Sequence, residues 1–135
     1  MNEVMVMEID NRNTRILLME TLYQYDLYKD QDLSFEPFFE DGHIKERFER
    51  ILNDLDRIDA LIESHLFNYK LYRLSYVDRA IIRLAVFELL ENEIPAALII
   101  NEAIELTKTY TNLDDEKQHK FNNRVIDAIY KSIKE

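Results

Sequence analysis

Residues 74–106 read LSYVDRAIIRLAVFELLENEIPAALIINEAIEL, and this stretch decides the fold. The Ser75 hydroxyl can cap a helix, and Asp78 three residues later favours the positive end of the helix dipole. Apolar side chains then recur at helical spacing, at Val77, Ile81, Leu84 and Ala85. Pro95 cannot donate a hydrogen bond, so it ends the first helix or begins a second. The stretch predicts a helical hairpin at the core of an all-helical domain.

Three further helical patterns surround this hairpin, at about Arg12–Tyr28, Ile44–Leu66 and Asp115–Ile133. The connection 29–43 is acidic and holds Phe35, Phe38 and Phe39, which predict a short helix tucked against the bundle, with Pro37 in its first turn. Residues 1–11 read either as an amphipathic arm or as a frayed end, and Asp10, Asn11 and Asn13 are candidate caps. The expected fold class is all-α, with six or seven helices in two small packed bundles.

Length and composition fit one compact domain over residues 1–135, with helical halves at about 1–68 and 69–135. The chain has one Gly, two Pro and no Cys, which favours long helices and excludes disulfides and thiolate chemistry. No apolar run is long enough to span a membrane, and no basic segment precedes an apolar one at the N-terminus. We therefore expect a cytoplasmic protein without a membrane partner.

The pattern from Ile44 to Leu66 leaves two interpretations open. Ile44, Phe48, Ile51, Leu55, Ile58 and Ile62 repeat at alternating steps of four and three. Such a seam is typical of a coiled-coil dimer, but this one is short and wide, which favours a helix packed inside a single chain. A monomer and a homodimer both remain compatible with the sequence.

Several segments, in order, resemble the NusB family of transcription antitermination factors. The resemblance is carried by RILLMETLYQYDL (15–27), RLSYVDRAIIRLAVFELL (73–90) with the following Ile-Pro, INEAIEL (100–106) and HKFNNRVIDAI (119–129). It covers nearly the whole chain. The last segment usually reads closer to KFVNGVLD in that family, so Asn122 and Arg124 stand where Val and Gly are usual.

The resemblance implies that the chain binds boxA-like single-stranded RNA together with the ribosomal protein NusE, as part of a transcription elongation complex. Cations for phosphates and aromatic faces for unstacked bases would carry such binding. The matching RNA-binding positions are Arg12, Arg15, Tyr23, Lys120, Phe121 and Asn123, with Arg124 as an addition. Asp78 and Arg83 match positions linked to NusE contact. Tyr23 and Phe121 also lie on apolar stripes, so core packing is the alternative for each.

The charge of the chain opposes RNA binding as a whole. The net charge is −10, of which residues 1–63 carry −9 and residues 64–135 carry −1. Phosphate binding needs cations, and the first half repels phosphate overall, whereas the second half leaves room for a local basic face. Residues 67–74 link the halves, and Tyr69 and Tyr72 alternate there with Lys70 and Arg73. The family's N-terminal arginine cluster is reduced to Arg12 and Arg15. A divergent interaction module with weak or no RNA affinity is therefore the alternative function.

The sequence offers little for catalysis. The pairs Glu88/Glu91 and Glu102/Glu105 each share a helix flank, and paired carboxylates can hold a metal or exchange protons. Neither pair has a His, Ser or Gly-loop companion, so a solvated face is the favoured interpretation. Glu88 falls near the apolar stripe and must find donors, for which Arg79, Arg83 and a neighbouring helix end are candidates. We expect no enzymatic activity, no metal and no cofactor.

Overall fold

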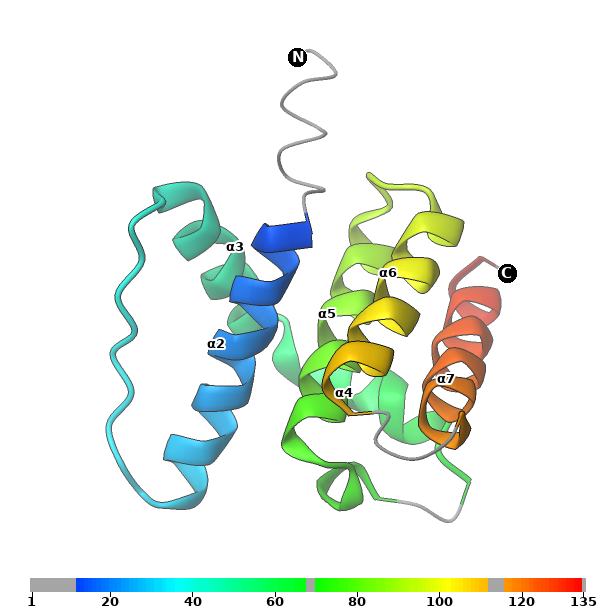
Figure 1. The fold of residues 1–135 in the computed structure, drawn as a ribbon, viewed down its shortest axis with the longest axis horizontal. Coiled ribbons are helices and arrows are strands. Elements are labelled where there is room, and N and C mark those ends of the chain that lie inside the picture. Colours follow the sequence, from blue (N-terminus) through cyan, green and yellow to red (C-terminus); the bar gives the residue numbers. More distant parts are fainter. Residues whose placement is uncertain (1–11, 68–69, 112–115, 135) are drawn as a thin grey trace.

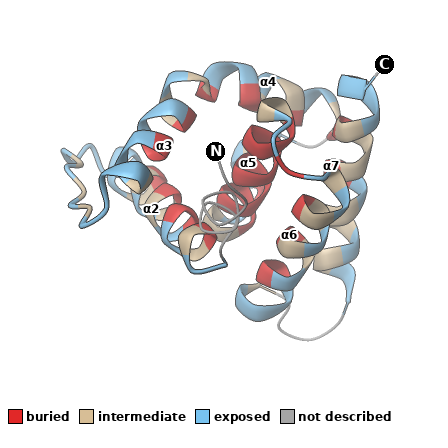
Figure 2. Cartoon of the chain, turned by 90° about the horizontal axis from the view of Figure 1, so that it is seen from above, coloured by how far each residue is buried: buried red, intermediate tan, exposed pale blue. Residues whose placement is uncertain are grey.

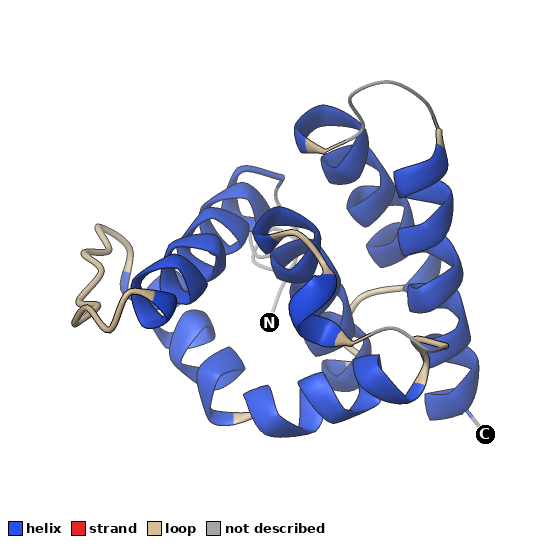
Figure 3. Ribbon diagram, turned by 90° about the horizontal axis from the view of Figure 1, so that it is seen from below, coloured by secondary structure: helices blue, strands red, loops and turns tan. Residues whose placement is uncertain are grey.

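The computed structural model describes residues 12–67, 70–111 and 116–134. These residues form six α-helices and one short 3₁₀-helix, and no strand occurs among them (Figures 1 and 3). The elements are α2 (Arg12–Asp30), α3 (Gly42–Asn53), α4 (Leu55–Ser64), η1 (Leu71–Arg73), α5 (Tyr76–Glu91), α6 (Ala96–Tyr110) and α7 (Lys117–Lys134). The expected all-α class is confirmed. The N-terminal arm with cap candidates Asp10 and Asn11, and also Tyr69, lie outside the described residues.

Helix α5 is the axis of the molecule. Every residue from Asp78 to Leu89 is buried, and α2, α4, α6 and α7 all pack against this helix (Figure 2). A helix that is buried on all sides is stable only when neighbouring helices surround it and supply partners for its charged side chains. One cluster of buried side chains runs from Leu18 in α2 to Ile129 in α7. The helices that precede α5 and those that follow it therefore share a single core.

The ends of the central hairpin follow the sequence closely. The Ser75 hydroxyl accepts a hydrogen bond from the Asp78 backbone N–H at 3.0 Å, as predicted for the N-cap of α5. Asn92 ends this helix in the left-handed conformation, with φ at 55°, a region that Asn tolerates better than most residues. Pro95 is the N-cap of α6, so the proline begins the second helix.

The long pattern from Ile44 to Leu66 is broken into two helices at Asp54. Asn and Asp favour caps over helix interiors, and Asp54 has non-helical dihedrals of −105° and 10°. The break lets α3 pack on α2 while α4 turns toward α5 and α7. Four seam residues from Phe48 to Ile58 are under 9% exposed within the one chain. This burial supports the bundle interpretation over a coiled-coil seam.

The short helix expected around Phe38 is absent, which corrects the sequence-based prediction. Residues 33–39 have no regular structure, because Pro37 lacks an N–H and disfavours helix at the residue before it. The rings of Phe35 and Phe39 pack against Phe48, with centroids 6.4 and 5.6 Å away. Phe38 is 85% exposed. No helix within the described residues has the length and apolar character needed to cross a membrane.

Candidate nucleic-acid interface

The most favourable surface for RNA lies at the N-terminal half of α7. One face of this helix is buried through Asn122, Val125, Ile126 and Ile129, which turns the other face outward. A shallow hollow of about 650 Å³ opens on the outward face. It is lined by Lys117, Gln118, Lys120, Phe121, Asn123 and Arg124. Four of the residues predicted to bind RNA are therefore neighbours on one surface.

Phe121 separates this hollow from a smaller one. The second hollow has a volume of about 200 Å³ and is lined by Leu74, Ser75, Asp78, Gln118 and Phe121. The Phe121 side chain is half-buried and packs against the core at its inner side. An aromatic ring in this position can be covered by a nucleobase, because every base has a π-face.

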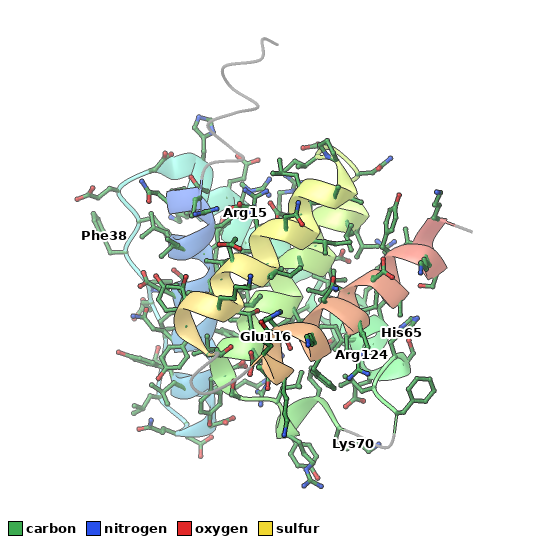
Figure 4. The ribbon with its side chains drawn as sticks, turned by 45° about the vertical axis from the view of Figure 1, so that its right-hand side comes forward. Arg15, Phe38, His65, Lys70, Glu116 and Arg124 are labelled. Carbon is green, nitrogen blue, oxygen red and sulfur yellow. The ribbon has the colours of Figure 1, made fainter. Side chains whose placement is uncertain are left out.

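The cations around Phe121 remain accessible. Lys120 pairs with Glu116 at 3.2 Å, but the two side chains are 66% and 70% exposed. Such a surface pair is weak and can be exchanged for a phosphate. Arg124 is exposed and has no ion-pair partner within 4 Å among the described residues. In Figure 4, Lys70, Glu116 and Arg124 lie in the lower part of the view, and Arg15 in the upper part.

Tyr23 lines neither of these two hollows and packs instead against Tyr76 in the first turn of α5. Its ring meets the Tyr76 ring edge-on, with centroids 6.1 Å apart, and the Tyr76 hydroxyl donates a hydrogen bond to Asp30. This hydrogen bond raises the pKa of Tyr76. Tyr23 is half-buried, so packing on Tyr76 accounts for its place in the sequence pattern and a base-stacking role stays a prediction.

Arg12 lines neither of the two hollows beside α7. It precedes Tyr23 by eleven residues, a distance of about 16 Å along a helix. Its Nε and Nη2 atoms donate to the two carboxylate oxygens of Glu102 at 3.0 and 2.8 Å. The pair lowers the pKa of Glu102 and raises the pKa of Arg12. The guanidinium charge is therefore already balanced by a carboxylate from α6.

Arg15 is not a surface residue, which argues against its predicted role as a phosphate ligand. Its side chain is 2% exposed and its Nη2 lies 3.0 Å from Glu88 Oε2. Arg47 approaches the same carboxylate at 3.9 Å and also binds Glu91 at 3.1 Å. The expected donors for Glu88 were Arg79 and Arg83 on its own helix or a neighbouring helix end. They come instead from α2 and α3, because three helices meet at this point.

Asp78 and Arg83, predicted to contact a protein partner, are each 5% exposed. Arg83 binds Asp26 at 2.8 Å and Asp59 at 2.9 Å. These carboxylates outweigh the desolvation of the guanidinium and raise its pKa. The Asp78 carboxylate accepts from Ser75 and from Asn122. Both side chains are occupied inside the protein, so their placement argues against direct contact with a partner.

Asn122 is a structural residue that sequence reasoning missed. It is fully buried, donates to Asp78 Oδ1 at 3.0 Å and to Thr107 Oγ1 at 3.1 Å, and accepts from Gln118 Nε2 at 2.9 Å. These bonds join α7 to α5 and α6 directly beneath Phe121. The only signal in the sequence was a polar residue where the resembled family usually has Val.

The described residues hold no group of three or more His, Asp or Glu side chains arranged to bind a metal. Three of the four paired carboxylates that could have served catalysis are engaged with arginines: Glu88 with Arg15, Glu91 with Arg47 and Arg50, and Glu102 with Arg12. Glu105 pairs with Lys108 at 3.9 Å. The chemistry that this surface offers is binding: cations, amides and an aromatic face at the start of α7.

Known proteins resemble the chain over most of its length. A model of the NusB family matches residues 12–131. The transcription antitermination protein NusB of Bacillus pumilus (strain SAFR-032) is 35% identical over 135 residues, which cover 92% of this chain and 97% of that protein. T. maritima NusB superposes with a TM-score of 0.70 at 34% identity, and the match covers 89% of each chain.

A second solved structure holds antitermination factors NusB and NusE in complex with double-stranded RNA. A chain of that structure superposes with a TM-score of 0.69 at 28% identity, covering 90% of this chain and 96% of that chain. The family match, the identity to a full-length relative and the shared helical fold lead to one conclusion: this chain belongs to the NusB family.

Proposed function

We propose that the chain is a transcription antitermination factor that binds boxA-like single-stranded RNA together with the ribosomal protein NusE and supports transcription of ribosomal RNA. Its relatives are named as antitermination proteins, and a structural neighbour is bound to NusE and RNA. The proposal assigns binding and no catalytic step to the chain. It places the protein in the cytoplasm, where bacterial transcription takes place, as a part of the elongation complex.

The observation that carries the proposal is the outward face of α7. Lys117, Lys120 and Arg124 surround Phe121 there, in a stretch of ten residues without an acid, 117–126. Cations bind phosphates whatever the sequence, and an aromatic ring binds an unstacked base. Single-stranded RNA presents both groups together. Duplex RNA keeps its bases stacked and offers mainly backbone and 2′-hydroxyls.

A second function is favoured by the state of the N-terminal arginines. Arg12 is paired with Glu102 and Arg15 is buried against Glu88, so neither family-matched arginine of α2 presents an unbalanced charge. Together with a net charge of −10, this supports a divergent NusB-fold module that binds a protein partner and has weak or no RNA affinity. The two functions differ in what Phe121 does.

Substitution of Phe121 separates the two functions. We expect Phe121→Leu, which keeps apolar packing but removes the π-face, to weaken binding of a boxA-containing RNA by about fivefold or more. Tyr130→Ala is the matched control, because Tyr130 is a half-buried aromatic at the far end of the same helix. Equal RNA affinity for wild type, Phe121→Leu and Tyr130→Ala, each with a helical circular dichroism spectrum, would favour the interaction module.

A further inference from the structure

The two longest acid-free stretches of this acidic chain meet in space. Residues 64–77 contain no Asp or Glu over fourteen positions, and residues 117–126 contain none over ten. The smaller hollow joins them, because Leu74 and Ser75 line it from the first stretch and Gln118 and Phe121 from the second. The two acid-free stretches therefore border one surface that extends from α7 across the start of α5 toward η1. Asp78, whose buried carboxylate accepts from Ser75 and Asn122, also lines the hollow between them.

The backbone of η1 is held firmly from inside. Arg79, which is 8% exposed, donates from Nη2 to the carbonyl oxygens of Tyr72 and Leu74 at 3.1 and 3.2 Å. Glu63 accepts from the Leu71 backbone N–H at 2.9 Å. Arg79 is in turn fixed by Asp26 at 3.4 Å. This turn is thus anchored to the core through its carbonyls and through the half-buried Leu71 side chain, while the Tyr72 and Arg73 side chains are exposed.

Tyr72 stands out on this anchored turn. Its side chain is 74% exposed, although its own carbonyl is bound by a buried guanidinium. Lys70 and Arg73, both exposed, lie on either side of it in the sequence. Single exposed aromatics are common on protein surfaces. Tyr72 is an exposed ring on a fixed backbone, and it lies between two cations. It is two positions before Leu74, which lines the smaller hollow together with Phe121. This combination has the composition of a base-stacking platform.

We propose that η1 is a second RNA-binding platform, on which Tyr72 stacks a base while Lys70 and Arg73 contact the neighbouring phosphates. The inference rests on the proposed RNA-binding function and extends it from α7 to η1. Single-stranded RNA would run from Phe121 over the smaller hollow to Tyr72. Because the backbone of η1 is already ordered, binding a base there does not require the turn to fold.

The platform is tested with RNA of two lengths. One probe is a boxA-containing single strand long enough to cover both Phe121 and Tyr72. The other is a shorter strand that covers Phe121 but does not reach Tyr72, so that Phe121→Leu still weakens its binding. We expect Tyr72→Ala to weaken binding of the long RNA by about fivefold or more and to leave the short RNA unchanged. Phe38→Ala is the matched control, because Phe38 is 85% exposed on the far connection between α2 and α3 (Figure 4).

The cations give an independent readout. Lys70→Gln should reduce the steepness of the salt dependence for the long RNA by about 0.7, the value for one phosphate contact of a single strand. Lys45→Gln changes an exposed lysine on α3 and should leave the salt dependence unchanged.

If Tyr72→Ala binds the long RNA normally while Phe121→Leu does not, the platform is refuted and the proposed function stands. Loss of NusE binding without loss of RNA binding in Tyr72→Ala also refutes it. If the wild type binds neither RNA, the proposed function itself fails.

Discussion

At the scale of single residues, buried arginines are the distinctive feature of this protein. Arg15, Arg47, Arg79 and Arg83 are each under 9% exposed. Charged side chains are almost never buried without partners, because desolvation of an ion costs several kcal/mol. Each of these guanidiniums meets a carboxylate from another helix. They fix which helices pack together, and they are not available to bind nucleic acid.

The pair of Arg15 and Glu88 gives a prediction about stability. Arg15→Leu removes the 3.0 Å ion pair of the buried Glu88 carboxylate, so we expect a loss of about 3–5 kcal/mol in the free energy of unfolding. The double variant Arg15→Leu/Glu88→Leu removes the buried carboxylate together with the guanidinium and should recover most of this loss. Urea denaturation measures both. If the double variant folds stably but no longer binds RNA, Arg15 contributes to the RNA surface after all.

Glu102 gives a prediction about pH. Arg12 lowers the pKa of this carboxyl in the folded protein, so the stabilisation is present above the unfolded pKa and is lost as the pH falls through the folded pKa. Glu102→Gln should remove this part of the acid sensitivity, as measured by thermal unfolding over a range of acidic pH. The same variant frees the Arg12 charge. A gain in RNA affinity at low salt would place Arg12 near the RNA, and an unchanged affinity would place it outside the contact.

At the scale of elements, α7 is joined to α5 and α6 by one polar cluster. Asn122, Asp78 and Thr107 are all buried, and Asn122 donates a hydrogen bond to each of the other two. A buried polar cluster is stable only when each member is satisfied. The side chains on the outer face of α7 are consequently presented from a fixed helix, which favours binding without rearrangement.

Asn122→Val replaces a buried donor with the residue usual at that position of the resembled family. The Asp78 carboxylate would lose its hydrogen bond from α7, and we expect a loss of about 1–3 kcal/mol in the free energy of unfolding. Asn123→Val, at a half-buried position one residue on, is the control and should change stability by less. Equal denaturation midpoints for the two variants would show that the cluster contributes nothing.

The elements show what a sequence can and cannot indicate. Helical periodicity and the Ser75 cap located the central hairpin correctly, because both are local properties of the chain. The break at Asp54 was missed, because the apolar seam continues through it. Whether a residue faces solvent depends on how helices pack. For that reason, similarity of residue type assigned Arg15, Asp78 and Arg83 to surfaces that the fold does not expose.

At the scale of the whole molecule, the charge distribution limits RNA binding. The net charge of −10 repels phosphate, and the acid-free stretches 64–77 and 117–126 provide five lysines and arginines for a single track. Three to five phosphate contacts correspond to a slope of about −2 to −3.5 in a plot of log affinity against log salt. We therefore expect weak binding by the chain alone and a large gain from a basic partner such as NusE, which would supply the missing cations.

The central claim is that this acidic chain binds single-stranded RNA through the surface around Phe121 and needs NusE to do so tightly. The most direct test is the equilibrium affinity for a boxA-containing single strand across a salt series, with and without NusE, and with the matching duplex as competitor. We expect weak binding with a slope of about −2 to −3.5 for the chain alone, a strong rise in affinity with NusE, and poor competition by the duplex. Equal affinity with and without NusE, or a duplex that competes as well as the single strand, would contradict it.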